Sequence, residues 1–303
     1  SIGVEMDINY SQASGNGVKG SKPETGMDMD RTDVFFHYKS RNTAAKVQVD
    51  FVTLNNGDYK SGKVLDDAWV SYEFIAPLQV KWGIESTYIV DPTSFDGDPL
   101  PTDPIVLRLE KQMMVELSGD VGIVSYGLQF WEDTEADQTQ DDQDGGGNYA
   151  VRFGYGSKGL DLNLVYRKDA KVSGTKNQTG YALGLEYGIK DLAVYAVYSN
   201  LMKDEDSEKG TSIILGARYV LKQTSFDLYW NQLDPVVAEN GKSQAAAALH
   251  FIVAYELNDN LSYEFSVISF PEGFGVTDVD PTTADLVKSE AYTFSSVGVK
   301  VRY

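Results

Sequence analysis

The sequence has no cysteine and only two histidines, His37 and His250, among its 303 residues. The lack of cysteine excludes a disulfide framework, a thiol nucleophile and cysteine-ligated zinc, and two histidines make a multi-histidine metal site improbable. Bases are also scarce, since 26 Lys and Arg stand against 45 Asp and Glu, for a net charge of −19. This charge argues against a nucleic-acid partner, which would need a basic face for the phosphates.

Long apolar runs and proline are scarce as well. The nearest approach to an apolar run is 245–255, which is too short for a transmembrane helix and contains His250. No signal peptide opens the sequence, as expected if a targeting segment is removed before this numbering begins. The chain holds 9 Pro but 28 Gly and 19 Tyr, and aromatic residues make up 12%. Disorder is excluded, because disordered chains have few aromatic residues.

What the sequence does have is apolar residues at every second position. In the last segment, Val297, Val299, Val301 and Tyr303 share one parity, while polar or very small residues occupy the other. Stretches such as 149–155, 160–166 and 181–187 repeat the pattern. A period of two predicts β-strands with one apolar face and one polar face.

Long polar connections alternate with short turns between these strands. Eight long loops and seven turns separate sixteen strands and leave both termini on the short-turn side. The sequence therefore predicts one all-β domain over 1–303, a 16-stranded antiparallel barrel. The predicted long loops are 11–27, 55–63, 86–104, 132–148, 168–178, 200–211, 232–242 and 271–288, and the predicted turns are 41–43, 75–77, 118–120, 157–159, 188–191, 221–224 and 257–260.

A water-soluble sandwich also alternates, but three features favour a transmembrane barrel. The strand content is far above the roughly 20–25% of soluble proteins. Aromatic residues mark both ends of the apolar face, as the girdles of a membrane barrel do. The other face carries so many charges that it must be wet, because a dry unpaired ion costs several kcal/mol. The predicted girdle residues are Phe74, Tyr155, Tyr187, Tyr219, Tyr255 and Tyr303 beside the turns, and Tyr10, Phe130, Tyr166, Tyr198 and Trp230 beside the loops.

The whole chain then resembles a Gram-negative general porin of the trimeric, sixteen-stranded kind. The final strand, with Val297, Val299, Val301 and Tyr303, is similar to the signal that the outer-membrane assembly machinery reads. The segment from 82 to 117 is similar to the stretch that leads into the third loop of these porins. The resemblance implies a homotrimer in the bacterial outer membrane, in contact with lipid and lipopolysaccharide, that passes small solutes by diffusion without a cofactor.

The resemblance also implies that the loop 86–104 folds into the lumen and is followed by the inward Arg108. Acids on this loop facing bases on the wall would set up a field that sorts ions by sign. The alternative is that these are ordinary solvated lumen charges. The loop acids are Glu85, Asp91, Asp96, Asp98 and Asp103, and the wall bases are Arg31, Lys39, Lys46, Lys81, Arg108, Arg152, Arg167, Arg218 and Lys300.

The acidic loop 132–148 is interpreted as a solvated mouth that raises the local cation concentration, so we expect weak cation preference. Weak divalent-cation binding at Asp141, Asp142 and Asp144 stays open as an alternative, although the bidentate Glu of a calcium loop is missing.

Three other functions stay open. A solute-specific channel for a sugar, phosphate or carboxylate could use the inward Trp69 for stacking. A barrel could also anchor or enclose a partner protein. A barrel enzyme would need His37 or His250, yet neither has a recognisable Ser and acid arrangement, so we expect no enzyme.

Overall fold

Strands account for nearly all of the residues described in the computed structural model, which are 2–14, 25–50, 65–75, 77–88, 111–131, 147–169, 178–203, 210–237, 243–258, 260–270 and 292–302. The described part of the chain contains no helix long and apolar enough to cross a membrane. The sixteen strands are β1 (Ile2–Ser14), β2 (Thr25–Ser40), β3 (Thr43–Asp50), β4 (Leu65–Ile75), β5 (Leu78–Ser86), β6 (Lys111–Val121), β7 (Val124–Trp131), β8 (Asn148–Ser157), β9 (Leu160–Asp169), β10 (Gln178–Ile189), β11 (Leu192–Lys203), β12 (Gly210–Leu221), β13 (Thr224–Val237), β14 (Ser243–Asn258), β15 (Leu261–Phe270) and β16 (Tyr292–Arg302).

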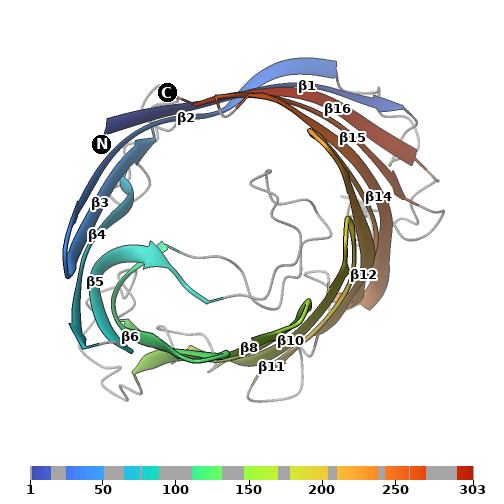
Figure 1. Cartoon of the computed structure of the whole chain (residues 1–303). Coiled ribbons are helices and arrows are strands. Elements are labelled where there is room, and N and C mark those ends of the chain that lie inside the picture. Colours follow the sequence, from blue (N-terminus) through green and yellow to red (C-terminus); the bar gives the residue numbers. More distant parts are fainter. Residues whose placement is uncertain are drawn as a thin grey trace, which may run out of the picture.

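The sheet closes on itself. Each strand pairs antiparallel with its sequence neighbours, and β1 also pairs with β16 in a register that places Met6 opposite Val301. Figure 1 shows this ring in a view along the barrel, with the two termini close together. Closure satisfies the backbone groups that an open sheet edge would expose, which is what a strand structure in lipid requires. The predicted 16-stranded antiparallel barrel is confirmed.

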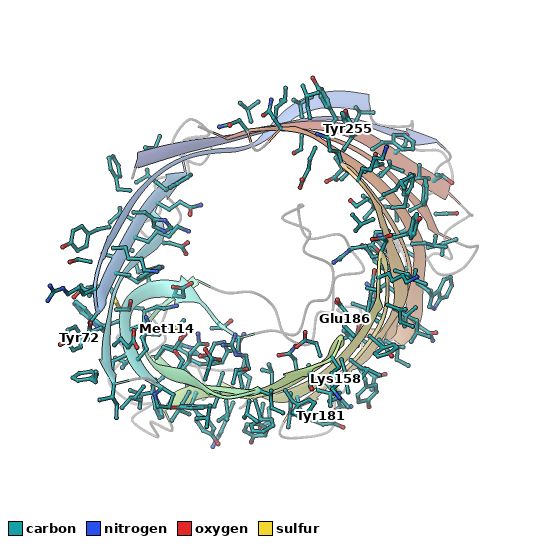
Figure 2. All side chains as sticks on the ribbon, viewed as in Figure 1. Tyr72, Met114, Lys158, Tyr181, Glu186 and Tyr255 are labelled. Carbon is teal, nitrogen blue, oxygen red and sulfur yellow. The ribbon has the colours of Figure 1, made fainter. Side chains whose placement is uncertain are left out.

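Alternation along each strand gives the barrel two different faces. The outward side chains are large and apolar, and Phe153, Leu185 and Leu228 are 49%, 42% and 49% exposed. Inward positions on the same strands carry polar, charged or small residues, many of them buried. Figure 2 shows Tyr72 and Tyr181 on the outside of the ring, and Met114 and Glu186 toward the inside. An apolar surface of this extent is stable against lipid but not against water.

Aromatic residues mark both ends of the outward band, as the sequence predicts. Phe74, Tyr187, Tyr219 and Tyr255 are exposed near the short turns, and Phe130, Tyr166 and Tyr198 are exposed near the long loops. The loop-side ring of Tyr198 also packs against Tyr181, with centroids 6.1 Å apart. These aromatic rings therefore lie at the two levels where a membrane meets water.

The short turns connect tightly to neighbouring hairpins. The second turn residue accepts a backbone hydrogen bond from the next hairpin, as Gly159 does from Gly188 at 2.7 Å and Asp191 from Val220 at 2.8 Å. Similar bonds from Gly156 to Ile123 and from Glu256 to Gln223 continue this belt. The belt fixes the turn ends of the barrel relative to one another.

One predicted turn is wrong. The sequence places a turn at 118–120, whereas β6 continues to Val121 and the chain reverses at Gly122 and Ile123. Gly122 has φ 64°, a left-handed conformation that glycine adopts easily. Gly119 serves a different purpose, because a Cβ there would lie 1.4 Å from the carbonyl oxygen of Pro77. Predicted loop edges differ in both directions: β1 runs to Ser14 and β13 to Val237, past the predicted loop starts, whereas β3 ends at Asp50, before the predicted loop 55–63 begins.

Candidate functional site

A rank of inward residues crosses the wall from β4 to β9. The ladder places Ser71 opposite Lys81, Lys81 opposite Glu116, and Glu116 opposite Gln129. The rank continues through Ala150 to Arg167. Directly opposite residues on one face of a sheet are close enough to interact. Strand register thus brings a base, an acid and an amide from three strands into one row.

Glu116 is the centre of this row. Its carboxylate accepts hydrogen bonds from the Ser118 hydroxyl at 2.8 Å and from the Gln129 amide at 3.0 Å. Lys81 Nζ lies 3.8 Å from Glu116 and 3.2 Å from Glu85. Glu116 is only 5% exposed, and a buried charge needs such partners to offset its lost hydration.

The row holds the first residues that follow β5. The backbone N–H of Tyr88 donates to Gln129 Oε1 at 2.8 Å, and Arg167 Nη1 donates to Thr87 Oγ1 at 3.1 Å. The guanidinium of Arg152 lies over the Tyr88 ring, 4.6 Å from its centroid. We call Gln129, Arg152, Arg167, Thr87 and Tyr88 the latch. The latch fixes the root of the third long loop against the inner wall.

Packing makes the position of Tyr88 specific. The ring lies on Gly127, where an added Cβ would be 2.0 Å from the phenol oxygen. Tyr88 is 7% exposed, and burial raises the pKa of its phenol above the ordinary value. The group therefore stays neutral at neutral pH and contributes shape rather than charge.

A second group of inward residues lies on β2 to β5. Lys46 forms an ion pair with Asp67. The Trp69 ring lies between two basic side chains, with Lys81 Nζ 5.0 Å from its centroid and the His37 ring centroid 6.3 Å away. Lys46 and Lys81 thus have carboxylate partners and add little net positive field to the lumen, whereas Lys39 at the end of β2 is exposed.

The wall formed by β11 to β14 is built differently. Tyr195, Val197, Ile214, Tyr229 and Ile252 form a buried apolar cluster at inward positions. At one edge of it, Arg218 Nε donates to Asp227 at 3.0 Å, and the Tyr195 hydroxyl also donates to Asp227. At the other edge, His250 stacks on Tyr229 with ring centroids 4.2 Å apart. Among the described residues, this wall combines an apolar cluster with an ion pair whose carboxylate is buried and with buried polar side chains such as Asn231 and His250.

The structure places the predicted site residues as follows. Glu85 and the wall bases Lys46, Lys81, Arg152, Arg167 and Arg218 have inward positions with the contacts given above, and Lys39 is exposed at the end of β2. Arg31 and Lys300 belong to β2 and β16, but their side chains are outside the described residues. Val297, Val299 and Val301 lie on one face of β16. Asp91, Asp96, Asp98, Asp103, Arg108, Asp141, Asp142, Asp144 and Tyr303 lie outside the described residues.

Sequence reasoning did not identify the latch residues Gln129, Thr87 and Tyr88, nor the acids Glu116 and Asp67. Their parity marks Gln129 and Glu116 as inward, yet parity does not reveal which strands align them. Only the register of β5, β6 and β7 makes them partners.

Known proteins have a similar sequence pattern and the same architecture. Residues 2–267 match the family model described as Gram-negative porin. No curated protein matches the sequence at a significant level. Three solved structures are similar along the whole of this chain. OmpF of Salmonella typhi in complex with daunomycin has 11% identity and TM-score 0.73, with 97% of its own chain covered. An anion-selective porin from Comamonas acidovorans has 13% identity and TM-score 0.70, and the trimer form of OmpT, an outer membrane protein of Vibrio cholerae, has 13% identity and TM-score 0.64, each with 99% of its own chain covered. At these identities the likeness shows a shared fold.

Proposed function

Because the chain belongs to the Gram-negative porin family, a family of outer-membrane channels, we propose that its barrel passes small hydrophilic solutes and ions by diffusion, with a weak preference for cations. The protein is a β-barrel of the bacterial outer membrane. The observation that carries the proposal is the two-faced wall. An apolar band with two aromatic girdles faces lipid, and a charged inner face requires water.

Cation preference is supported by how the wall bases are paired. Lys46, Lys81 and Arg218 each have a carboxylate within 4.0 Å. Their positive charges are therefore largely compensated, while the chain as a whole carries −19. The Comamonas porin is anion-selective by its own description, but at 13% identity its selectivity does not carry over.

We also propose that the segment 86–104 narrows the lumen and brings Asp91, Asp96, Asp98 and Asp103 to the path of the solute. The latch supports this proposal, because it holds Thr87 and Tyr88 against the inner wall where the segment begins. Acids held there would face Lys39 and other wall bases across the gap and attract cations.

A homotrimer is the proposed assembly, in contact with lipid and lipopolysaccharide. Its support is the trimer form among the similar structures. The alternating end of β16, with Val297, Val299 and Val301, supports recognition by the outer-membrane assembly machinery. In a planar bilayer, we expect each inserted particle to add three equal conductance increments. Single independent increments would contradict the trimer.

Liposome swelling tests diffusion directly. Proteoliposomes containing the purified barrel should swell in neutral sugars and polyols at rates that fall smoothly with solute size and do not saturate with concentration. Protein-free liposomes and heat-denatured protein are the controls. Absence of swelling with folded, heat-modifiable protein would contradict an open diffusion channel.

A solute-specific channel is the second candidate function, and Trp69 is the observation that favours it. Its ring is partly exposed at an inward position between His37 and Lys81, an arrangement that can stack on the apolar face of a sugar. This function predicts that one sugar blocks the ion current in a saturable way and that Trp69→Ala abolishes the block. Diffusion alone predicts no saturable block.

A further inference from the structure

The short turns carry basic residues in a backbone conformation that such residues seldom adopt. Among the described residues, the non-glycine positions with positive φ are Arg41, Lys158, Lys190 and Lys222, with φ of 32°, 50°, 56° and 56°. Each is the first of two residues that join adjacent strands. Two-residue hairpin turns with positive φ favour Asn, Asp and Gly, because a larger side chain is strained there. A lysine at three neighbouring turns therefore needs a reason other than turn formation.

The three lysines lie on neighbouring hairpins at one end of the barrel. β9 pairs with β10 and β11 pairs with β12, so the turns of Lys158, Lys190 and Lys222 follow one another along the rim. Two strand spacings separate consecutive turns, which places them roughly 10 Å apart across the strands. The hydrogen bonds from Gly188 to Gly159 and from Val220 to Asp191 fix this spacing.

Their surroundings place these lysines where an apolar membrane interior would end. Ile189 and Leu192, which flank the turn of Lys190, are 56% and 42% exposed, and Leu221 next to Lys222 is 50% exposed. The girdle residues Tyr187 and Tyr219 lie three residues before Lys190 and Lys222. A lysine just beyond an apolar band and an aromatic girdle can extend its ammonium group to the level of the lipid phosphates.

The lysines are also available for such a contact. All three are exposed, and within the described residues none of them forms an ion pair. Asp191 shares the turn of Lys190, but other nearby acids of the described part of the chain occupy lumen-facing positions. They include Asp120, Asp161, Glu186 and Glu256.

We propose that Lys158, Lys190 and Lys222 form a binding surface for the anionic phospholipid headgroups of the membrane leaflet on the short-turn side. The phosphate of a glycerophospholipid offers acceptor oxygens to each ammonium group, and a second negative group or the absence of a choline cation favours acidic lipids over zwitterionic ones. The surface anchors this end of the barrel in register with the headgroups. It depends on the membrane location of the barrel and not on the proposed selectivity of its lumen.

The test compares lipid retention by two triple variants of the full chain. Barrels are purified in non-ionic detergent, incubated with equal amounts of phosphatidylglycerol and phosphatidylcholine, and examined by native mass spectrometry. The triple variant Lys158→Asn, Lys190→Asn and Lys222→Asn should lower the ratio of bound phosphatidylglycerol to phosphatidylcholine by about fivefold or more. The reason is that even a single lysine near an acidic lipid surface strengthens binding by roughly fivefold. The matched variant with Arg at the same positions should keep the ratio of the unmodified protein.

Asn suits the turn conformation, so the Asn variant should be at least as heat-stable as the unmodified protein, which separates loss of charge from loss of fold. An unchanged lipid ratio in a folded Asn variant would overturn the proposal and indicate that the lysines serve another partner, such as an acidic polymer. A lipid ratio that falls equally in the Arg variant would also overturn it, because charge would then not be the cause.

Discussion

The β5–β9 and β11–β14 walls of the lumen have the same alternation along their strands, but their inward side chains differ. On the β5–β9 wall, inward positions hold Lys81, Glu116 and Gln129 in a row of ion-pair and hydrogen-bond contacts, and Gln129 accepts from the N–H of Tyr88. On the β11–β14 wall, inward positions hold a buried apolar cluster next to the ion pair between Arg218 and Asp227. The first wall is a support for a loop root, and the second is a packed surface.

The polar lumen is therefore not uniform around its circumference. Each wall contains a glycine covered by a tyrosine ring, Gly127 under Tyr88 and Gly216 under Tyr195. On one wall the ring comes from the loop root and is held by polar groups, whereas on the other it comes from the neighbouring strand. Substitutions matched between the walls can therefore separate loop positioning from barrel stability.

The largest effect is expected from Gln129→Leu. It removes the acceptor of the Tyr88 N–H and a donor to Glu116, and two buried groups left unpaired should lower the free energy of unfolding by about 3 kcal/mol. Current noise in the open channel should rise, because the loop root is released. Denaturant titration in lipid and planar-bilayer recordings measure the two effects. Ser212→Ala on the other wall is the control, and equal noise in both variants would contradict the latch.

Gly127→Ala is expected to have a somewhat smaller effect. The added Cβ meets the Tyr88 phenol oxygen, and the forced shift should cost about 1–3 kcal/mol and change the single-channel conductance. Adding Tyr88→Phe should restore part of both, because removal of the hydroxyl makes room for the methyl group. Gly216→Ala, which meets the Tyr195 ring, should lower stability with little change in conductance. Conductance changes of equal size from both glycines would remove the distinction between the walls.

The paired change of Asp96 and Asp98 to Asn extends the comparison to charge. The cation-to-anion permeability ratio should fall by roughly twofold, because fewer fixed negative charges attract cations to the gap. Reversal potentials in a salt gradient report this ratio. An unchanged reversal potential would show that these acids do not set the selectivity.

The smallest effect is expected from Lys39→Gln. This base is exposed on the wall, so its removal should raise cation preference slightly and leave stability within about 0.5 kcal/mol. Reversal potentials measure the ion preference and denaturant titration measures the stability, and Lys81→Gln is the variant for comparison. Lys81 contacts Glu85, Glu116 and the Trp69 ring, so its loss should lower stability more than that of Lys39.

The barrel could be predicted from the sequence because alternation is a local property. The pattern at Val297, Val299 and Val301 shows which side chains share a face without any knowledge of the neighbouring strand. The turn after β6 was missed because two glycines lie within four residues. Gly119 accommodates the backbone of Pro77 from another hairpin, and only Gly122 makes the turn.

The latch could not be predicted for a related reason. Arg152 and Arg167 were identified as inward bases, but a parity argument cannot place them against Tyr88 and Thr87, since these partners lie 64 and 80 residues apart in sequence. The same limit applies to Glu116 and Gln129, whose pairing depends on the register of two strands. Faces are encoded within a strand, whereas hydrogen-bonded rows are encoded between strands.

The reversal potential of the unmodified protein in a planar bilayer, with a potassium chloride gradient across it, tests the central claim most directly. Compensated wall bases and an acidic chain predict stable conductance with a reversal potential on the cation side. A reversal potential at zero or on the anion side would contradict cation preference, and the absence of conductance from folded protein would contradict the open channel itself.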